Sequence, residues 1–120
     1  MSDYKQMIIL RKDLGMRKGK MVSQGAHASM AALLEDGQLK DDDRILEWLA
    51  GRFTKVCVSV NSEEELLALH AKAKEAGMIT ALIQDAGLTE FNGVLTYTAV
   101  AIGPDTHEAL QPLTSELKLL

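Results

Sequence analysis

Short apolar runs and alternating segments along this chain predict a sheet of four main strands. Residues 7–10 form a compact apolar run, MIIL, between polar residues, which is typical of a strand buried on both faces. Residues 53–60 alternate between two sets of side chains and are rich in β-branched residues, which also indicates a strand. Residues 78–84 and 94–102 predict two further strands, and residues 117–120 predict a short edge strand.

The segments between these strands carry the signals of helices. Residues 20–35 predict a first helix, in which Gly25 costs up to ~1 kcal/mol against Ala and therefore indicates close contact with a sheet or a ligand. Residues 44–50 predict a second helix, whose start the carboxylates of residues 41–43 would cap. Consecutive carboxylates at a helix start do not converge on one point, so we prefer capping over metal binding for these three.

Two more helices are predicted in the second half of the chain. The third, residues 62–76, begins with Ser62 and Glu65 at the spacing of a capping box. Residues 103–104, Gly-Pro, would end the fourth strand, and Asp105 would cap a short fourth helix after it.

The resulting order is strand, helix, helix, strand, helix, strand, strand, helix. Such alternation is typical of an α/β protein whose sheet is partly parallel and covered on both faces. The third and fourth strands are near neighbours along the chain, which favours an antiparallel pair. We therefore expect a single domain over residues 1–120, folded as a three-layer α/β/α sandwich with a mixed, mostly four-stranded sheet.

Composition and charge narrow the function. The 120 residues carry a net charge of −4, which argues against a general nucleic-acid binder, although screening makes a binding site respond mainly to its own neighbours. Cys57 is the single cysteine, so neither an intrachain disulfide nor a zinc ribbon can form, and we expect it to be a small core or half-buried side chain rather than a nucleophile. No secretory signal and no apolar run of membrane-spanning length is visible, so a cytoplasmic protein is expected.

One stretch departs from the acidic background. Residues 11–20 hold five cations and one acid, the cations being Arg11, Lys12, Arg17, Lys18 and Lys20. The last two lead directly into the first predicted helix, whose start has N–H groups without intrahelical partners and a partial positive charge. This arrangement favours an anion such as a phosphate group, and a solvated basic loop is the alternative.

Lys20, Gln24 and His27 follow at i, i+4 and i+7, so they share one stripe of the helix. For His27 we expect a packed histidine bonded to a loop carbonyl rather than a catalytic group. For Gln24, positioning of a ligand and a buried structural hydrogen bond are equally compatible with the pattern.

Asp85 directly follows the third predicted strand, as the basic loop follows the first. If these strands are parallel, both segments open on the same edge of the sheet, where ligands gather in open α/β sheets. Asp85 and Gly87 would present a carboxylate on a turn, with Thr89 close enough to bond it or a substrate. An Asx-type turn cap is the structural alternative, and the motif alone favours it.

Three segments, KGKMVSQGAHA, LIQDAGLT and TYTAVAIGP, resemble in this order and spacing the peptidyl-tRNA hydrolases of the second type, the archaeal and eukaryotic kind also found in some bacteria. The final ELKLL resembles the end of those proteins, so the likeness covers almost the whole chain. The resemblance implies hydrolysis of the ester that joins a peptide to the 3′ end of tRNA, which releases tRNA for reuse. It also implies one α/β/α domain that is often a homodimer and needs no metal or other cofactor.

The resemblance further implies which residues act. Lys20, Asp85 and Thr89 match the family's lysine, aspartate and threonine, and are expected to be catalytic. Asp85 would orient or deprotonate the attacking water, a step worth typically about 10²–10⁴-fold. Lys20 would stabilise the oxyanion or hold the terminal phosphate.

Other positions are expected to bind the substrate. Lys18, Gln24 and Thr98 match positions in or near the family's site, and Arg17 joins them as a cation standing where the family usually has Gly. Leu88 stands where many members carry a basic residue. The loss of that cation would weaken the grip on tRNA, and Arg17 would partly restore it.

Two other functions fit the same residues. One is an enzyme that deacylates another charged tRNA or ester, and the other is a module that binds tRNA or a phosphorylated ligand without catalysis. The presence of Lys20, Asp85 and Thr89 together favours an enzyme, because binding a polyanion would not need a carboxylate nearby.

Overall fold

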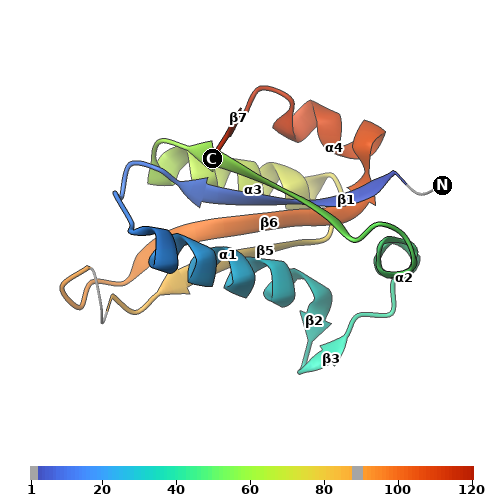
Figure 1. Ribbon diagram of the computed structural model, residues 1–120, viewed down its shortest axis with the longest axis horizontal. Helices are drawn as coiled ribbons and strands as arrows, with labels where there is room; N and C mark the ends of the chain where they lie inside the picture. Colours follow the sequence, from blue (N-terminus) through green and yellow to red (C-terminus); the bar gives the residue numbers. More distant parts are fainter. Residues whose placement is uncertain (1–2, 88–90) are drawn as a thin grey trace.

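A five-stranded sheet forms the middle layer of the molecule within residues 3–87 and 91–120, which the computed structural model describes (Figure 1). Its strands are β1 (Tyr4–Arg11), β4 (Thr54–Val60), β5 (Thr80–Asp85), β6 (Thr96–Thr106) and β7 (Lys118–Leu119). They lie side by side in the order β5-β6-β1-β4-β7. β1 and β4 are parallel, whereas the other neighbouring strands are antiparallel, so the sheet is mixed.

Helices cover both faces of this sheet (Figure 1). They are α1 (Lys18–Leu33), α2 (Asp43–Ala50), α3 (Glu63–Glu75) and α4 (His107–Thr114), and a small hairpin of β2 (Leu34–Glu35) and β3 (Gln38–Leu39) follows α1. α1 and α2 pack on one face, and α3 and α4 pack on the other. The predicted α/β/α sandwich with a mixed sheet is therefore confirmed, with β7 as its fifth strand.

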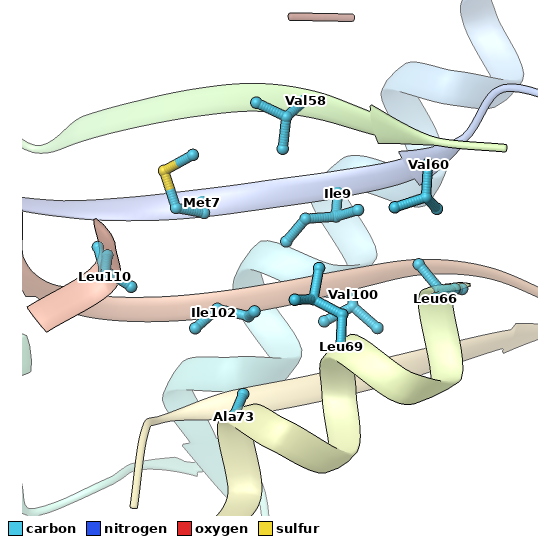
Figure 2. Close-up of a cluster of buried hydrophobic side chains, with 10 residues drawn as sticks. All are labelled: Met7, Ile9, Val58, Val60, Leu66, Leu69, Ala73, Val100, Ile102 and Leu110. Atoms are coloured by element: carbon cyan, nitrogen blue, oxygen red, sulfur yellow. The ribbon is translucent and has the colours of Figure 1, made fainter. Parts of the chain in front are cut away.

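Alternation along the central strands sends side chains into two separate cores. Met7 and Ile9 of β1 face α3 and α4, in the cluster whose ten side chains Figure 2 shows. Leu10 of β1 and Ala99 of β6 face the opposite way and belong to the second core, which also contains Trp48 of α2. Full burial of a Leu- or Ile-sized side chain stabilises by about 1.5–3 kcal/mol, so these two apolar layers hold the helices on the sheet.

The second core brings α1 close to the sheet. Ala28 and Ala32 of this helix are fully buried, and a Cβ atom at Gly25 would lie 3.4 Å from Cγ2 of Ile8. A larger side chain at this position would push α1 away from β1. The close contact expected at Gly25 is confirmed, and its neighbour is the sheet.

The predicted helix caps in the middle of the chain are confirmed. The side chain of Asp42 accepts a hydrogen bond from the N–H of Arg44 at the start of α2, at 2.9 Å. Ser62 accepts one from the N–H of Glu65 at the start of α3, at 3.0 Å. The edge strand near residue 118 and the antiparallel pairing of β5 with β6 are also confirmed.

Both predicted ends of α1 are wrong. The sequence predicts a helix from Lys20 to Glu35, whereas α1 begins at Lys18 and ends at Leu33. The last residues of that prediction belong instead to the β2–β3 hairpin. Asp36 and Gly37 form its turn with positive φ angles of 52° and 79°, which a helix cannot accommodate.

The fourth strand also differs from its prediction. β6 continues past Gly103 to Thr106, because Gly103 adopts a φ of 101° that glycine tolerates and the register against β1 shifts at this point. As a result, Thr106 rather than Asp105 caps α4 by accepting from the N–H of Ala109.

Cys57 is exposed rather than buried, since it lies on β4 in a groove beside α1.

None of the helices within the described residues combines the length and the hydropathy that crossing a membrane requires.

A buried polar pair ties α1 to the sheet. Gln6 is fully buried, its Nε2 donates to the carbonyl oxygens of Ser29 and Gly103 at 3.1 and 3.3 Å, and its Oε1 accepts from the Ser29 hydroxyl. We expect Ser29→Ala to lower the free energy of unfolding by about 1–3 kcal/mol, because Oε1 loses its donor where water cannot replace it. Urea denaturation measures this change. Ser23→Ala, at an exposed position of the same helix, is the control and should change it by less than about 0.5 kcal/mol; equal effects of the two substitutions would contradict the prediction.

Candidate active site

An ion pair between Lys20 and Asp85 joins two segments that lie 65 residues apart in the chain. Nζ of Lys20 donates to Oδ1 of Asp85 at 2.9 Å, and the two side chains are 12% and 16% exposed. The pair is thus shielded from most of the solvent, which strengthens its interaction, yet a small molecule can still reach it. The prediction that these two side chains lie together is confirmed, whereas their catalytic roles stay predictions.

The topology of the sheet explains this meeting. β1 and β5 run in the same direction because each is antiparallel to β6, which lies between them. Their carboxyl ends therefore reach the same edge, where β1 leads into α1 and β5 ends at Asp85 (Figure 1). Lys20 lies in the first turn of α1, and so reaches the end of β5 across β6.

Gln24 and Thr98 hold the carboxylate of Asp85 from the interior side of the site. Nε2 of Gln24 donates to Oδ1 of Asp85 at 3.2 Å, and the hydroxyl of Thr98 donates to Oε1 of Gln24. This second bond sets the orientation of the amide, because the nitrogen must then face the carboxylate. Gln24 is 2% exposed and Thr98 is fully buried, so both act within the protein interior.

A backbone group completes the surroundings of Asp85. The N–H of Gly87 donates to Oδ2 at 2.8 Å, so the Asx-type turn considered as a structural alternative is present together with the ion pair. The hydrogen bond from Lys20 holds the pKa of Asp85 below its usual value, against the opposing effect of burial, and the bonds from Gly87 and Gln24 act in the same direction as Lys20. Asp85 is therefore ionised at neutral pH.

The aromatic ring of Phe91 borders the ion pair. Nζ of Lys20 lies 5.4 Å from the centroid of this ring, a distance at which an ammonium is attracted to the ring face. The turn at Gly87 is predicted from the sequence and is confirmed. Phe91 is not predicted as a site residue, because no local pattern indicates that its ring reaches Lys20.

The basic stretch divides into structural and exposed cations. Arg11 is 11% exposed, binds both carboxylate oxygens of Asp13 at 2.7 and 3.1 Å, and donates to the carbonyl oxygen of Tyr97 at 3.1 Å. It therefore fastens the loop before α1 to β6 and cannot serve as an exposed anion contact. Arg17 and Lys18, by contrast, are exposed at the start of α1.

The start of α1 can receive an anion. Arg17 occupies the N-cap position with an extended backbone, no described side chain caps the helix, and its first turn holds no acid. N–H groups at such a start favour a negative partner, and Lys18 adds an ammonium there. The expected cationic helix start is thus present, and Lys20 lies in its first turn.

Some predicted features are absent or lie elsewhere. His27 is exposed, so the expectation of a packed histidine bonded to a loop carbonyl is wrong. Its side of α1 faces solvent at this position. Thr89 and Leu88 lie outside the described residues. Within residues 3–87 and 91–120 no group of three or more His, Cys, Asp or Glu side chains could hold a metal ion, and Asp42 caps α2 as expected.

Known proteins resemble this chain along almost its whole length. The family model described as peptidyl-tRNA hydrolase PTH2 matches residues 4–120. The protein named peptidyl-tRNA hydrolase from Methanocaldococcus jannaschii is 46% identical over 116 residues, which cover 97% of this chain and 99% of the relative. Those from Methanothermobacter thermautotrophicus and Methanopyrus kandleri, with the same name, are 42% and 40% identical and cover 97% and 98% of this chain, and 99% and 98% of their own lengths.

The Lys20–Asp85 pair, its position at the carboxyl edge of a mixed sheet, and these matches agree with the resemblance seen in the sequence. The chain belongs to the peptidyl-tRNA hydrolase PTH2 family.

Proposed function

We propose that this protein is an enzyme that hydrolyses the ester between a peptide, or an N-blocked amino acid, and the 3′ end of tRNA. The observation that carries the proposal is the 2.9 Å pair of an ammonium and an ionised carboxylate at the edge of the sheet, beside a cationic helix start. Ester hydrolysis needs a positioned water and stabilisation of an oxyanion, and a polyanionic substrate needs cations nearby. Membership of the PTH2 family supports the same reaction.

In this proposal Asp85 positions the attacking water. The described part of the chain donates three hydrogen bonds to its carboxylate, from Lys20, Gln24 and Gly87, and a carboxylate offers about four acceptor positions, so a water can take the fourth. The lowered pKa makes Asp85 a weak base, which favours orientation of the water over full removal of its proton.

Lys20 meets the charge that develops in the reaction. The water oxygen attacks the ester carbonyl carbon, and the resulting oxyanion lies beside the ammonium. The bond to the ribose oxygen then breaks, and one of the two protons of the water passes to that oxygen. The other proton is released to solvent, and the peptide leaves as a carboxylate. Thr89 is proposed to assist in positioning the water or the ester, as the family resemblance implies.

The remaining predicted residues divide by their exposure. Arg17 and Lys18, both exposed beside the start of α1, are proposed to contact tRNA phosphates. Gln24 and Thr98 are proposed to serve the substrate indirectly, because their chain of hydrogen bonds holds Asp85 in place from the interior.

The proposal requires no cofactor, since Lys20 supplies the positive charge that a metal ion would otherwise provide. We place the reaction in the cytoplasm, where translation produces peptidyl-tRNA.

The first experiment compares N-acetyl-aminoacyl-tRNA with the unblocked aminoacyl form and measures release of free tRNA in the presence of EDTA. We expect cleavage of the blocked form alone.

Asp85→Asn should lower kcat/KM for the blocked form by about 10²–10⁴-fold, because it weakens the orientation of the water. Lys20→Ala should lower it by about 10²–10³-fold, because the oxyanion loses its ammonium.

Two exposed residues of α3 provide matched controls. Glu75→Gln and Lys74→Ala make the same kinds of charge change away from the site and should leave kcat/KM unchanged. Near-normal rates for the Asp85 and Lys20 variants, with intact circular dichroism, would remove both residues from the mechanism.

The substrate comparison has its own outcomes. Cleavage of the unblocked form would indicate a different deacylase, and cleavage of neither form would indicate a binding module. Loss of activity in EDTA would contradict the absence of a cofactor.

The lowered pKa of Asp85 predicts a pH dependence. The carboxylate is the active form, so activity that depends on it should persist as the pH falls below the usual pKa of an aspartate, until the pH reaches the lowered value. The stabilisation from the ion pair follows the same course. It is present above the pKa that Asp85 has in the unfolded chain, and it is lost as the pH falls through the lower pKa that Asp85 has in the folded protein.

In Lys20→Ala the pKa of Asp85 should rise, which an NMR titration of the Asp85 carboxyl carbon measures. An unchanged titration midpoint would show that Lys20 does not set this pKa.

We also propose that the protein acts as a homodimer. A groove of about 570 Å³ runs between α1 and the β1–β4 part of the sheet, and its exposed surface is almost entirely apolar. Val22, Met30 and Leu120 line it and are 72%, 53% and 44% exposed, which is unusual for large apolar side chains gathered in one place. A second copy that presents the same surface would cover it by two-fold symmetry.

Light scattering tests the dimer. The unsubstituted protein should have twice the mass of one chain, and Met30→Glu should yield monomers because it places a charge in the apolar contact. Leu46→Glu, on α2 outside the groove, is the matched control, since Leu46 is also 53% exposed. A monomeric unsubstituted protein, or equal masses for the two variants, would exclude this interface.

A further inference from the structure

Two large aliphatic side chains stand exposed next to the candidate active site. Val94 and Leu95, in the connection between β5 and β6, are 62% and 64% exposed. Scattered exposed apolar residues are common on protein surfaces, but these two are consecutive and adjoin the residues that surround Asp85.

The backbone of Val94 is held firmly against the turn that presents Asp85. Its N–H donates to the carbonyl oxygen of Phe91 at 2.9 Å, and its carbonyl oxygen accepts from the hydroxyl of Thr96 at 2.9 Å. The N–H of Gly93 donates to the carbonyl oxygen of Gly87 at 2.8 Å. These three hydrogen bonds fix the backbone at Gly93 and Val94 beside Gly87.

Gly87 couples this connection to the carboxylate. Its φ is 78°, and a Cβ atom there would collide with the carbonyl oxygen of Val94, so the two backbones touch. The N–H of the same glycine donates to Asp85. Val94 therefore rests on the residue that orients the carboxylate.

The two connections at this edge of the sheet differ in chemistry. The one that leads into α1 carries the exposed cations Arg17 and Lys18, and the one between β5 and β6 carries Val94 and Leu95. The Lys20–Asp85 pair links them, and both lie at the same end of the molecule (Figure 1). The substrate has the same asymmetry, since its ester joins a polyanion to an acyl group that carries an amino-acid side chain.

We propose that Val94 and Leu95 form a platform for the side chain of the amino acid esterified to the tRNA. This inference rests on the proposed function and assigns the acyl side of the substrate to the β5–β6 connection. Aliphatic groups favour removal of another apolar group from water, whereas a nucleobase would be held better by an aromatic or guanidinium plane. The nearby ring of Phe91 is half-buried and faces Lys20, so it is not presented as such a plane.

The test uses one tRNA body esterified with either N-acetyl-leucine or N-acetyl-glycine and compares kcat/KM. An enclosed apolar pocket discriminates by roughly 10–200-fold per methylene at most, so an open platform should favour the leucyl ester by about 5–10-fold. In the double variant Val94→Thr/Leu95→Asn this ratio should fall below about 2-fold, mainly through a lower rate with the leucyl ester.

Matched controls and outcomes separate this inference from the proposed function. The double variant Leu46→Asn/Leu49→Asn replaces two exposed aliphatic residues on α2 and should keep the ratio of the unsubstituted protein. An unchanged ratio in the Val94/Leu95 variant, or equal losses with both esters, would overturn the platform, the latter by indicating a contact with the tRNA instead. If the unsubstituted protein cleaves both esters without preference, the platform alone fails. If it cleaves neither, the proposed function fails as well.

Discussion

The contact between the ammonium of Lys20 and the carboxylate of Asp85 depends on the position of β6. This strand lies between β1 and β5 and is antiparallel to both, so it turns them to face the same edge of the sheet. It also supplies Thr98, which orients Gln24 and through it Asp85. A single strand therefore determines which connections meet and how the carboxylate between them is held.

The stability of the protein and the chemistry of its site come from different groups. Two apolar cores hold the helices on the sheet, and neither of them includes Lys20, Asp85 or Gln24. A shielded ion pair contributes little net stability, because the cost of removing two charges from water offsets much of their attraction. The pair is better explained by what it can do to a substrate, since it keeps an ionised carboxylate and an ammonium together where an ester can reach them.

The cations of the basic stretch serve more than one purpose. Arg11 binds Asp13 and the carbonyl oxygen of Tyr97, and so fixes the loop that leads into α1. Arg17 and Lys18 remain at the surface at the start of this helix. The opposite connection exposes Val94 and Leu95, so an aliphatic pair lies across the ion pair from these cations. A substrate that joins a polyanion to an acyl chain matches this division.

Much of the fold could be predicted from the sequence because local patterns determine it. The alternation in residues 53–60 and the caps at Asp42 and Ser62 depend on near neighbours in the chain, and each predicted element was found. The end of β6 could not be predicted in this way, because it depends on a strand that is distant in the chain. A Gly-Pro pair usually ends a strand, but β1 lies alongside Gly103 and extends the pairing.

The candidate site shows the same division. The sequence by itself determined that Lys20 lies near the start of a helix and that Asp85 lies at the end of a strand, and family resemblance singled out both. Only the tertiary structure decided that their side chains meet at 2.9 Å, that His27 turns to solvent, and that Phe91 lies over the ammonium. The physical reason is that such contacts depend on the order and direction of strands far apart in the chain, and the pattern of residues within one segment carries no record of its neighbours in space.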